Sequence, residues 1–181
     1  MYYSTTYLSP VGALTLACDG ENIVGLWIEG QKYYGAAISG KMVEKSDIPV
    51  FRKAKNWLDK YFNGKKPLVS ELPLAPAGGK FRQMVWGILR EIPYGEVVTY
   101  GGIAEKIAAK TNRASMSAQA VGGAVGHNPI SVIIPCHRVV GTNGSLTGYA
   151  GGIGIKVKLL ELESADMSRL FVPKKGTALG R

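Results

Sequence analysis

Cysteine is scarce in this chain of 181 residues, which contains only Cys18 and Cys136. Two cysteines so far apart give little support to a disulfide framework of the kind that stabilises small secreted domains. Histidine is equally scarce, with His127 and His137 alone, and there is no CxxC pair. A four-ligand zinc site made of these residue types would use all four side chains. The sequence therefore disfavours a zinc site and favours a reducing compartment.

Long apolar runs are missing as well. No stretch approaches the ~18 apolar residues that a membrane span requires. The first ten residues, MYYSTTYLSP, lack both the basic start and the apolar core of a signal peptide, so we expect an intracellular, cytoplasmic protein. Hydrophobic residues make up 46% of the chain and charged residues 19%, which is typical of an ordinary globular protein.

Acidic residues are outnumbered by basic ones. The 13 Asp and Glu residues face 22 Lys and Arg residues, which leaves a net charge of +9. Residues 1–80 carry +3 of this excess, and residues 81–181 carry +6. Such an excess indicates an anionic partner, nucleic acid first, because neutralised phosphates release their counterions. A soluble surface that happens to be basic would give the same charge, so both interpretations stay open.

The N-terminal part predicts strands followed by a helix. Between residues 2 and 30, short apolar runs alternate with the turn signals SP, DG and EG, as in antiparallel hairpins. Residues 48–64 predict a helix that starts at Pro49 and stops at Gly64. The proline-rich residues 65–79 are typical of a linker, and we place a domain boundary at residue 78. The apolar stripe of the predicted helix consists of Phe51, Ala54, Trp57, Leu58, Tyr61 and Phe62.

Past that boundary the pattern becomes helical. Thr99 can cap a helix over residues 100–110, and residues 116–126 predict another, so the pair is compatible with a helix-turn-helix. A last helix is expected over residues 155–164. Residues 80–92 predict a further helix, with a buried face of Phe81, Val85, Ile88, Leu89 and Ile92.

The stretch IPCHRVV, residues 134–140, places Cys136 beside His137. A thiolate is the attacking species, and the pKa of a cysteine falls beside a histidine, a basic residue or a helix N-terminus. On a regular strand adjacent side chains point to opposite faces, so His137 can assist only if the backbone turns or a water bridges the two. Pro135 fits such an irregular strand end. We interpret Cys136 as an ionised nucleophile, against the alternative of a small buried hydrophobe.

A histidine that acts as a base needs an acceptor that orients it. Glu161 and Glu163 on the last predicted helix are the candidates. We expect Arg138 to order the active-site loop rather than to touch phosphate. Cys18 lies in an apolar, strand-like run and is expected to belong to the core.

The surroundings of Cys136 resemble a known family. IPCHRVV is preceded by AVGGAVGHNP and followed by GSLTGYAGGIGIKVKLLELE. Over roughly residues 81–165 this pattern resembles the O6-alkylguanine-DNA alkyltransferases, also called methylated-DNA–protein-cysteine methyltransferases. The resemblance implies an α+β fold: a small antiparallel-sheet (RNase H-like) α/β domain over residues 1–78, a mostly helical winged helix-turn-helix domain over residues 79–167, and a polar tail over residues 168–181.

The resemblance also implies a chemistry. Family members flip an O6-alkylated guanine out of the duplex through the minor groove, at an unstacking cost of about a few kcal/mol. A cysteine then accepts the alkyl group irreversibly, and O4-alkylthymine is implied as a second substrate. Each molecule reacts once and needs no cofactor or metal. The implied partner is double-stranded DNA containing alkylated guanine, with no membrane and no obligate protein partner, so a monomer is expected.

Catalytic roles are implied position by position. Cys136 would be the acceptor, and His137 would polarise it through a water. Glu163 would complete the relay by holding the imidazole. Asn128 would brace the segment before the active-site turn.

Substrate contacts are implied in the same way. Tyr100 would push the phosphate backbone and hydrogen-bond guanine N3, and the carbonyls of Cys136 and Val139 would accept from the exocyclic amine. Tyr149 would line the alkyl pocket, and the Ala150 N–H would face guanine O6. The residues expected to bind DNA are Tyr100, Arg113, Ser115, Gln119, Ala120, Gly122 and Gly123, where the two glycines would allow close approach to neighbours or to DNA.

Gln119 departs from the family, which typically carries an arginine there to fill the gap left by the flipped base. Glutamine is shorter and uncharged, so we expect weaker stabilisation of the extrahelical base and slower repair of duplex DNA. The small Ala150 is expected to admit bulkier alkyl groups. The zinc that some relatives hold in their N-terminal domain lacks a Cys and His supply here.

Two other functions stay in competition. A non-catalytic relative would bind the lesion and flag it for other repair, but such proteins lack the acceptor that Cys136 provides. A helix-turn-helix regulator with an inert cysteine would show sequence-specific binding and no thiol reactivity. A cysteine protease fits poorly, because its histidine is normally distant in sequence from the nucleophile.

Overall fold

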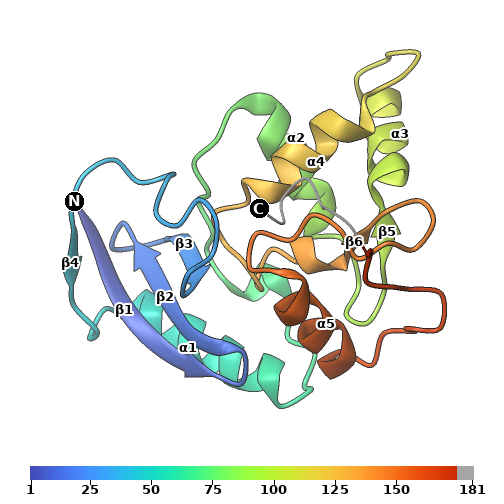
Figure 1. Ribbon diagram of the computed structural model, residues 1–181. Helices are drawn as coiled ribbons and strands as arrows, with labels where there is room; N and C mark the ends of the chain where they lie inside the picture. The colour runs from blue at the N-terminus through green and yellow to red at the C-terminus, as the bar shows by residue number, and fades with distance from the viewer. Residues whose placement is uncertain (175–181) are drawn as a thin grey trace. The chain divides into compact units, whose positions relative to one another are not determined.

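The computed structural model describes residues 1–174 as parts of two compact units (Figure 1). The first unit combines residues 1–78 with residues 129–133, and the second combines residues 79–128 with residues 134–174. The return of residues 129–133 to the first unit lies directly before the predicted active-site stretch. Composition and turn signals gave no sign of this return.

The first unit is built on a four-stranded sheet with the strand order β3-β2-β1-β4. The strands β1 (Tyr2–Ser9), β2 (Gly12–Cys18) and β3 (Ile23–Ile28) form antiparallel hairpins, which confirms the prediction from the turn signals. The short strand β4 (Met42–Glu44) pairs with β1 in parallel, so the sheet is mixed rather than purely antiparallel. Alternation over three residues is too short a signal to reveal such a strand.

Helix α1 (Pro49–Phe62) packs on this sheet. It begins at Pro49, whose missing N–H costs a first helical turn nothing. Gly64 follows the helix with φ of 72°, a conformation that favours glycine. The predicted stripe is buried except for Phe62, which is half-buried.

The outer edge of β3 is covered by two chain segments. The backbone of Ile23 bonds to Pro73 and Ala75, both at 2.9 Å, and that of Leu26 bonds to residues 129–131, also at 2.9 Å. The stretch predicted as a linker is therefore partly bonded to the sheet, and it also contains the short 3₁₀ helix η1 (Val69–Glu71). A covered edge is protected from pairing with other chains.

The second unit is mostly helical. Helices α2 (Lys80–Leu89), α3 (Tyr100–Lys110) and α4 (Ala118–Gly126) pack against one another. The strands β5 (Val98–Thr99) and β6 (Val139–Val140) form a small parallel pair.

Caps define where these helices start. The Thr99 hydroxyl accepts from the Gly102 N–H at 2.9 Å, as the sequence predicted for α3. Ser117 caps α4 in the same way through the Ala120 N–H, at 3.2 Å, so this helix begins two residues later than expected. On α2, Val85, Ile88 and Leu89 are buried as predicted, whereas Phe81 is half-buried.

Helix α5 (Ile153–Leu162) lies against the 3₁₀ helix η2 (Cys136–Arg138). It starts two residues earlier than predicted and ends at Leu162, so Glu163 follows the helix instead of lying on it. A carboxylate at a helix end can be reached from more directions than one within a turn. This position matters for the site described below.

Part of the predicted polar tail pairs with a loop. The Phe171 N–H donates to the Gly144 carbonyl at 3.1 Å, and the Leu146 N–H donates to the Phe171 carbonyl at 2.9 Å. A Cβ on Gly144 would lie 2.0 Å from the Arg169 carbonyl oxygen, so this approach requires glycine. The rest of the predicted tail, residues 175–181, lies outside the described residues. Across residues 1–174, no helix has the length and apolar character of a bilayer-spanning segment.

Candidate active site

Cys136 opens the short helix η2 instead of lying on a strand. The backbone reaches it through a tight turn at Pro135 (φ −81°, ψ 65°), in which the Cys136 N–H donates to the Ile134 carbonyl at 2.8 Å. The Val139 N–H then donates to the Cys136 carbonyl. The backbone therefore turns at the cysteine, which meets one of the two conditions for assistance by the neighbouring histidine.

His137 is fully buried, and its Nε2 lies 2.6 Å from Oε1 of Glu163. Burial holds the pKa of His137 below its ordinary value, although Glu163 acts in the opposite direction. A neutral ring that donates from Nε2 to a carboxylate keeps Nδ1 as the nitrogen able to take up a proton. Glu161, the other candidate acceptor, is exposed.

Glu163 is a buried, ionised carboxylate with several donors. Besides His137, it accepts from Nε and Nη2 of Arg138, at 2.8 and 2.9 Å, and from the Gly95 N–H at 3.0 Å. Burial alone would raise the pKa of this carboxyl, but the bonds and charges of His137 and Arg138 outweigh it and hold the pKa well below its usual range. Gly95 has φ of 81°, and a Cβ there would lie 2.8 Å from the Glu163 carbonyl oxygen, so the turn requires glycine.

Arg138 is 6% exposed and points into the unit. Its Nη1 donates to the Ile92 carbonyl, and its guanidinium lies 5.7 Å from the centre of the Tyr94 ring. Together with the bidentate bond to Glu163, these contacts tie η2 to the segment after α2. The position is the one expected of a residue that orders the loop instead of touching phosphate.

The thiol of Cys136 is buried, and its surroundings act on its pKa in opposite directions. Burial raises its pKa, while a hydrogen bond from Asn128 and the charge of Lys156 lower it without overcoming the effect of burial. Asn128 also donates from Nδ2 to the Ile134 carbonyl at 2.8 Å, which braces the turn before the cysteine. Our expectation of an ionised sulfur stays a prediction, because burial and these neighbours act on the thiol in opposite directions.

Lys156 is a site residue that the sequence reasoning missed. The residue is fully buried on α5, and its Nζ donates to the carbonyls of Val139 and Thr147. Burial lowers its pKa to about 8. A signal was present, because Lys156 stands four and seven residues before Leu160 and Glu163, on one face of an apolar helix.

Tyr149 and Ala150 follow in the loop before α5. Tyr149 is buried, and its ring lies edge-on to His137 with 6.4 Å between ring centres. Its hydroxyl has no hydrogen-bond partner among residues 1–174, and burial raises its pKa well above the ordinary value, so it stays protonated. Ala150 is half-buried. The Val139 carbonyl, expected to accept from guanine, already accepts from Lys156.

A hollow of about 520 Å³ opens beside Tyr100. It is lined by Gln119, Gly122 and Gly123 of α4 and by parts of the loop between Gly141 and Gly148. The Tyr100 hydroxyl donates to the Thr147 carbonyl at 2.9 Å. Four of the residues expected to bind DNA thus meet on one surface.

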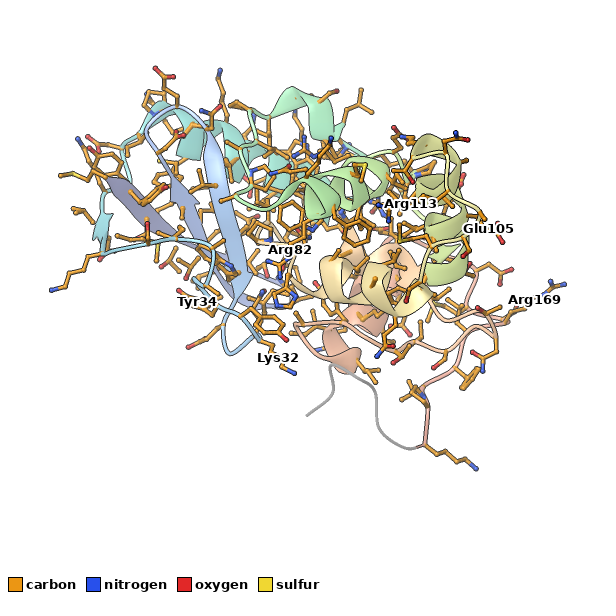
Figure 2. The ribbon with its side chains drawn as sticks, turned by 90° about the horizontal axis from the view of Figure 1, so that it is seen from above. Lys32, Tyr34, Arg82, Glu105, Arg113 and Arg169 are labelled. Atoms are coloured by element: carbon orange, nitrogen blue, oxygen red, sulfur yellow. The ribbon has the colours of Figure 1, made fainter. Side chains whose placement is uncertain are left out.

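Arg113 and Ser115 line a second hollow of about 500 Å³, between α3 and the turn that leads to α4. Both are exposed, and Arg113 and Glu105 can be found on this side of α3 in Figure 2. Ala120 is exposed on the first turn of α4. The residues expected to bind DNA therefore lie in two neighbouring groups along the α3 and α4 pair.

Gly122 and Gly123 are not required by packing within the protein. A Cβ on Gly122 would lie 3.8 Å from the Tyr100 ring, which is ordinary contact, and one on Gly123 would meet nothing within 4 Å. Of the two reasons considered for these glycines, close approach to protein neighbours is therefore wrong. Approach to DNA stays a prediction.

Protein-family models match nearly the whole chain. Residues 1–76 match the ribonuclease-like domain of 6-O-methylguanine DNA methyltransferase, and residues 80–165 match the DNA binding domain of the same family. The methylated-DNA–protein-cysteine methyltransferase of Haemophilus influenzae is 45% identical over 89% of this chain and 86% of its own length. That of Methanosarcina acetivorans is 44% identical over 91% and 99%.

Solved structures agree with these sequence matches. The O6-methylguanine methyltransferase of Mycobacterium tuberculosis is 40% identical and covers 97% of both chains, with a TM-score of 0.77. A structure of Mycobacterium tuberculosis OGT in complex with DNA gives a TM-score of 0.76 at 41% identity, over 93% of this chain and 94% of that one.

Proposed function

Because this chain belongs to the 6-O-methylguanine DNA methyltransferase family, we propose that it repairs DNA by moving the alkyl group of O6-alkylguanine onto Cys136. The observation that carries the proposal is the arrangement around that thiol. A cysteine on a tight turn is followed by a neutral histidine, which an ionised glutamate holds at 2.6 Å. This arrangement suits a thiol that is deprotonated only when it reacts.

Double-stranded DNA with an alkylated guanine is the substrate. The reacting carbon lies inside the duplex, so the base must be flipped out through the minor groove, at a cost of about a few kcal/mol. The basic charge of residues 81–181 favours binding to the phosphates. Tyr100 lies at the start of α3 and lines the first hollow, and its proposed role is to push on the backbone near the flipped nucleotide.

The transfer is a displacement in which one bond forms and one breaks. A proton leaves Sγ of Cys136 through a bridging water for Nδ1 of His137, and the sulfur attacks the alkyl carbon. The bond between that carbon and O6 breaks, and its electron pair passes into the guanine ring. The base then takes up one proton, so that overall one proton moves from the thiol to guanine.

The remaining contacts orient the base. The carbonyls of Cys136 and Val139 accept from its exocyclic amine, and the Ala150 N–H donates to O6. Tyr149 forms a wall of the pocket that receives the alkyl group. Asn128 holds the turn that presents the sulfur, through its bond to the Ile134 carbonyl at 2.8 Å.

The reaction occurs once per molecule. A thioether has no good leaving group, so the product cannot return to the thiol without further chemistry. The chain's own residues supply the nucleophile and the base, and the proposed step draws on no cofactor. O4-alkylthymine presents a similar oxygen-bound carbon and is a second substrate, and a DNA substrate implies an intracellular place of action.

The test is to incubate the protein with a duplex oligonucleotide that contains one O6-methylguanine and to measure intact mass. We expect a gain of one methyl group per molecule, located at Cys136 by peptide mapping. Cys136→Ala should gain nothing, and Cys18→Ala, which removes the other buried thiol, should react like the original chain. A methyl group on another residue, or none at all, would contradict the proposal.

A further inference from the structure

Helix α1 of the first unit presents a basic outer face. One face of the helix packs on the sheet (Figure 1), and the exposed side chains beyond Pro49 are polar or charged. Residues 49–66 contain six Lys and Arg residues against one Asp, a net charge of +5. The remaining residues of the same unit contain three lysines against six acidic residues, a net charge of −3. The positive charge of this unit is therefore concentrated on one helix and the turn after it.

Four exposed cations form this surface, which we call the α1 basic surface. Its members are Arg52, Lys53 and Lys60 on the helix and Lys65 in the turn that follows. Lys53 and Lys60 stand two helical turns apart and line one hollow of about 120 Å³ together with Asn56. The Lys65 N–H donates to the Lys60 carbonyl at 2.9 Å, which fixes the turn at the end of the helix. The four cations are therefore held on one short, regular segment of the chain.

Carboxylates neutralise little of this charge. Glu71 lies 3.8 Å from Nζ of Lys60, in an ion pair that is exposed on both sides. Within residues 1–174, Arg52, Lys53 and Lys65 form no ion pair with a carboxylate. Three exposed cations are thus available to an anion from outside the chain.

The stability of the helix accounts for only half of these cations. A positive charge is favourable near the C-terminus of a helix and unfavourable near its N-terminus, because of the helix dipole. Lys60 lies in the last turn of α1 and Lys65 follows it, so the dipole favours both. Arg52 and Lys53 lie close to the start, and the first turn has no acidic residue to offset them. Their charges fit a role in binding an anion.

The surface has no aromatic ring that could stack on a base. Trp57 lines the hollow, but it is buried, and its indole N–H donates to the Leu68 carbonyl at 2.8 Å. Tyr61 is buried as well. Binding of single-stranded nucleic acid relies on stacking of this kind. A surface that offers charge alone suits the regular phosphates of a duplex.

We propose that the α1 basic surface binds the phosphates of duplex DNA whether or not a lesion is present. The inference goes beyond the proposed function, which assigns DNA binding to residues 100–123 of the other unit. Because both units belong to one chain, DNA held by the second unit raises the local concentration of phosphates for the first. Contacts of this kind are individually weak and independent of sequence, so they prolong the time spent on undamaged DNA during the search for a lesion.

The experiment compares the original chain with the triple variant Arg52→Gln, Lys53→Gln, Lys65→Gln, which removes three charges and breaks no ion pair. The probes are lesion-free duplexes of about 12 and about 36 base pairs, and fluorescence anisotropy measures binding between about 50 and 300 mM salt. Each lost phosphate contact lowers the slope of log affinity against log salt by about 0.9. We expect the slope to become less steep by about two, and the affinity at about 100 mM salt to fall about tenfold or more.

A matched variant controls for net charge. Lys32→Gln, Lys41→Gln, Lys45→Gln removes three charges from the same unit outside α1 and should keep the slope of the original chain. Both triple variants should react with the free base O6-benzylguanine at the original rate, because none of the six residues contributes to the proposed active site. That rate also shows that the variants are folded.

The two duplex lengths separate two sources of phosphate. If the α1 basic surface contacts the duplex that the second unit holds, the original chain and the α1 variant differ on the longer duplex alone. If it takes another duplex, the original chain binds two short duplexes at low salt and the α1 variant binds one. Either result supports the proposal.

Other outcomes contradict it. Equal slopes for the original chain and the α1 variant on both duplexes would overturn the proposal. An equal loss of slope in the variant of Lys32, Lys41 and Lys45 would do the same, because net charge would then be the cause. Loss of binding to poly-glutamate in the α1 variant, with DNA binding unchanged, would assign the surface to an acidic protein instead. Failure of methyl transfer to Cys136, with the expected DNA results intact, would defeat the proposed function and leave this inference standing.

Discussion

The two units bury different kinds of polar side chain. In residues 1–78 and 129–133 the buried polar groups are neutral, whereas in the other unit they include three charged residues and a histidine. A buried charge lowers stability unless it is paired and hydrogen-bonded. The second unit therefore carries groups that stability alone does not favour, which marks it as the unit that performs the chemistry. The neutral set is Thr5, Gln31 and Ser131; the other set is Asn128, His137, Arg138, Lys156 and Glu163.

The first unit satisfies its few buried polar groups locally. The Gln31 side chain accepts from the Ile28 N–H at 2.8 Å and from the Ser131 hydroxyl at 3.0 Å. The second of these bonds holds residues 129–133, which lead directly to the turn at Cys136. Within the first unit, this bond ties residues 129–133 to the segment after β3 without placing a charged group in the interior.

Glu163→Gln should have the largest effect, because it removes one of the buried charges that distinguish the second unit from the first. Glutamine cannot carry the charge that holds both His137 and Arg138, so the guanidinium is left without its counter-charge. Loss of one partner of a buried pair lowers the free energy of unfolding by about 3–5 kcal/mol. Transfer should slow by about a hundredfold, because the imidazole loses its orientation and the apparent pKa of the thiol rises. Urea denaturation and single-turnover rates on methylated duplex DNA measure both effects, while DNA affinity should stay unchanged.

Two controls make this result specific. Leu58→Ala in α1 removes a fully buried side chain of the first unit and should cost about 2–5 kcal/mol, yet transfer by the folded variant should keep its rate. Glu161→Gln, which changes an exposed carboxylate, should alter neither quantity. If Leu58→Ala slowed transfer as much as Glu163→Gln, the rate loss would reflect lower stability and not the relay.

The pH dependence of stability should come from the second unit. The pKa of Glu163 is held below its usual range, so its stabilisation is present at neutral pH and is lost as the pH falls below the ordinary carboxyl pKa. The pKa of His137 is also lowered, so below about pH 6.5 the unfolded chain takes up a proton that the folded chain does not. Both effects lower stability in acid.

Lys156 acts in the alkaline range. Its pKa is about 8 in the folded protein, whereas in the unfolded chain the lysine keeps its proton up to about pH 10. The free energy of unfolding should therefore rise between about pH 8 and pH 10.

Urea denaturation from pH 2 to pH 10 measures both limbs. Lys156→Met should lose the rise above pH 8 and keep the acid limb, whereas Glu163→Gln should flatten the acid limb. A curve for Lys156→Met that still rose above pH 8 would assign that limb to another group.

Local patterns predicted much of the fold. The hairpins followed from turn signals, and α1 and α3 followed from apolar periodicity and from Pro49 and Thr99 at their starts. The strand β4 and the return of residues 129–133 to β3 could not be predicted, because both depend on pairing between segments distant in sequence. Periodicity reports which face of a segment is buried, not which segment lies against it.

The candidate site was also predicted only in part from the sequence. The PCHR motif pointed to Cys136 and His137, and Glu163 was one of two candidate acceptors. The burial of the thiol was not foreseen, because adjacency in sequence suggested activating neighbours and gave no measure of burial. Lys156 was missed because a lysine in a sequence reads as a surface residue unless its helical face is examined.

Gln119 offers the smallest expected effect. It is exposed on the first turn of α4 and lines the same hollow as Tyr100, so its side chain can reach the space beside a flipped nucleotide. Gln119→Arg adds a charge and a flat stacking surface. Single-turnover repair of duplex DNA should become about three- to tenfold faster, and the salt dependence of DNA binding should steepen by about one counterion.

The free base O6-benzylguanine separates an effect on base flipping from an effect on the chemistry. It needs no flipping, so it should react with Gln119→Arg at an unchanged rate. Gln83→Arg, which adds the same charge at an exposed position of α2 in the same unit, controls for net charge and should leave duplex repair unaltered. Equal duplex rates for Gln119→Arg and the original chain would mean that this position does not limit base flipping. A gain on the free base as well would move the effect from flipping to the chemistry at Cys136.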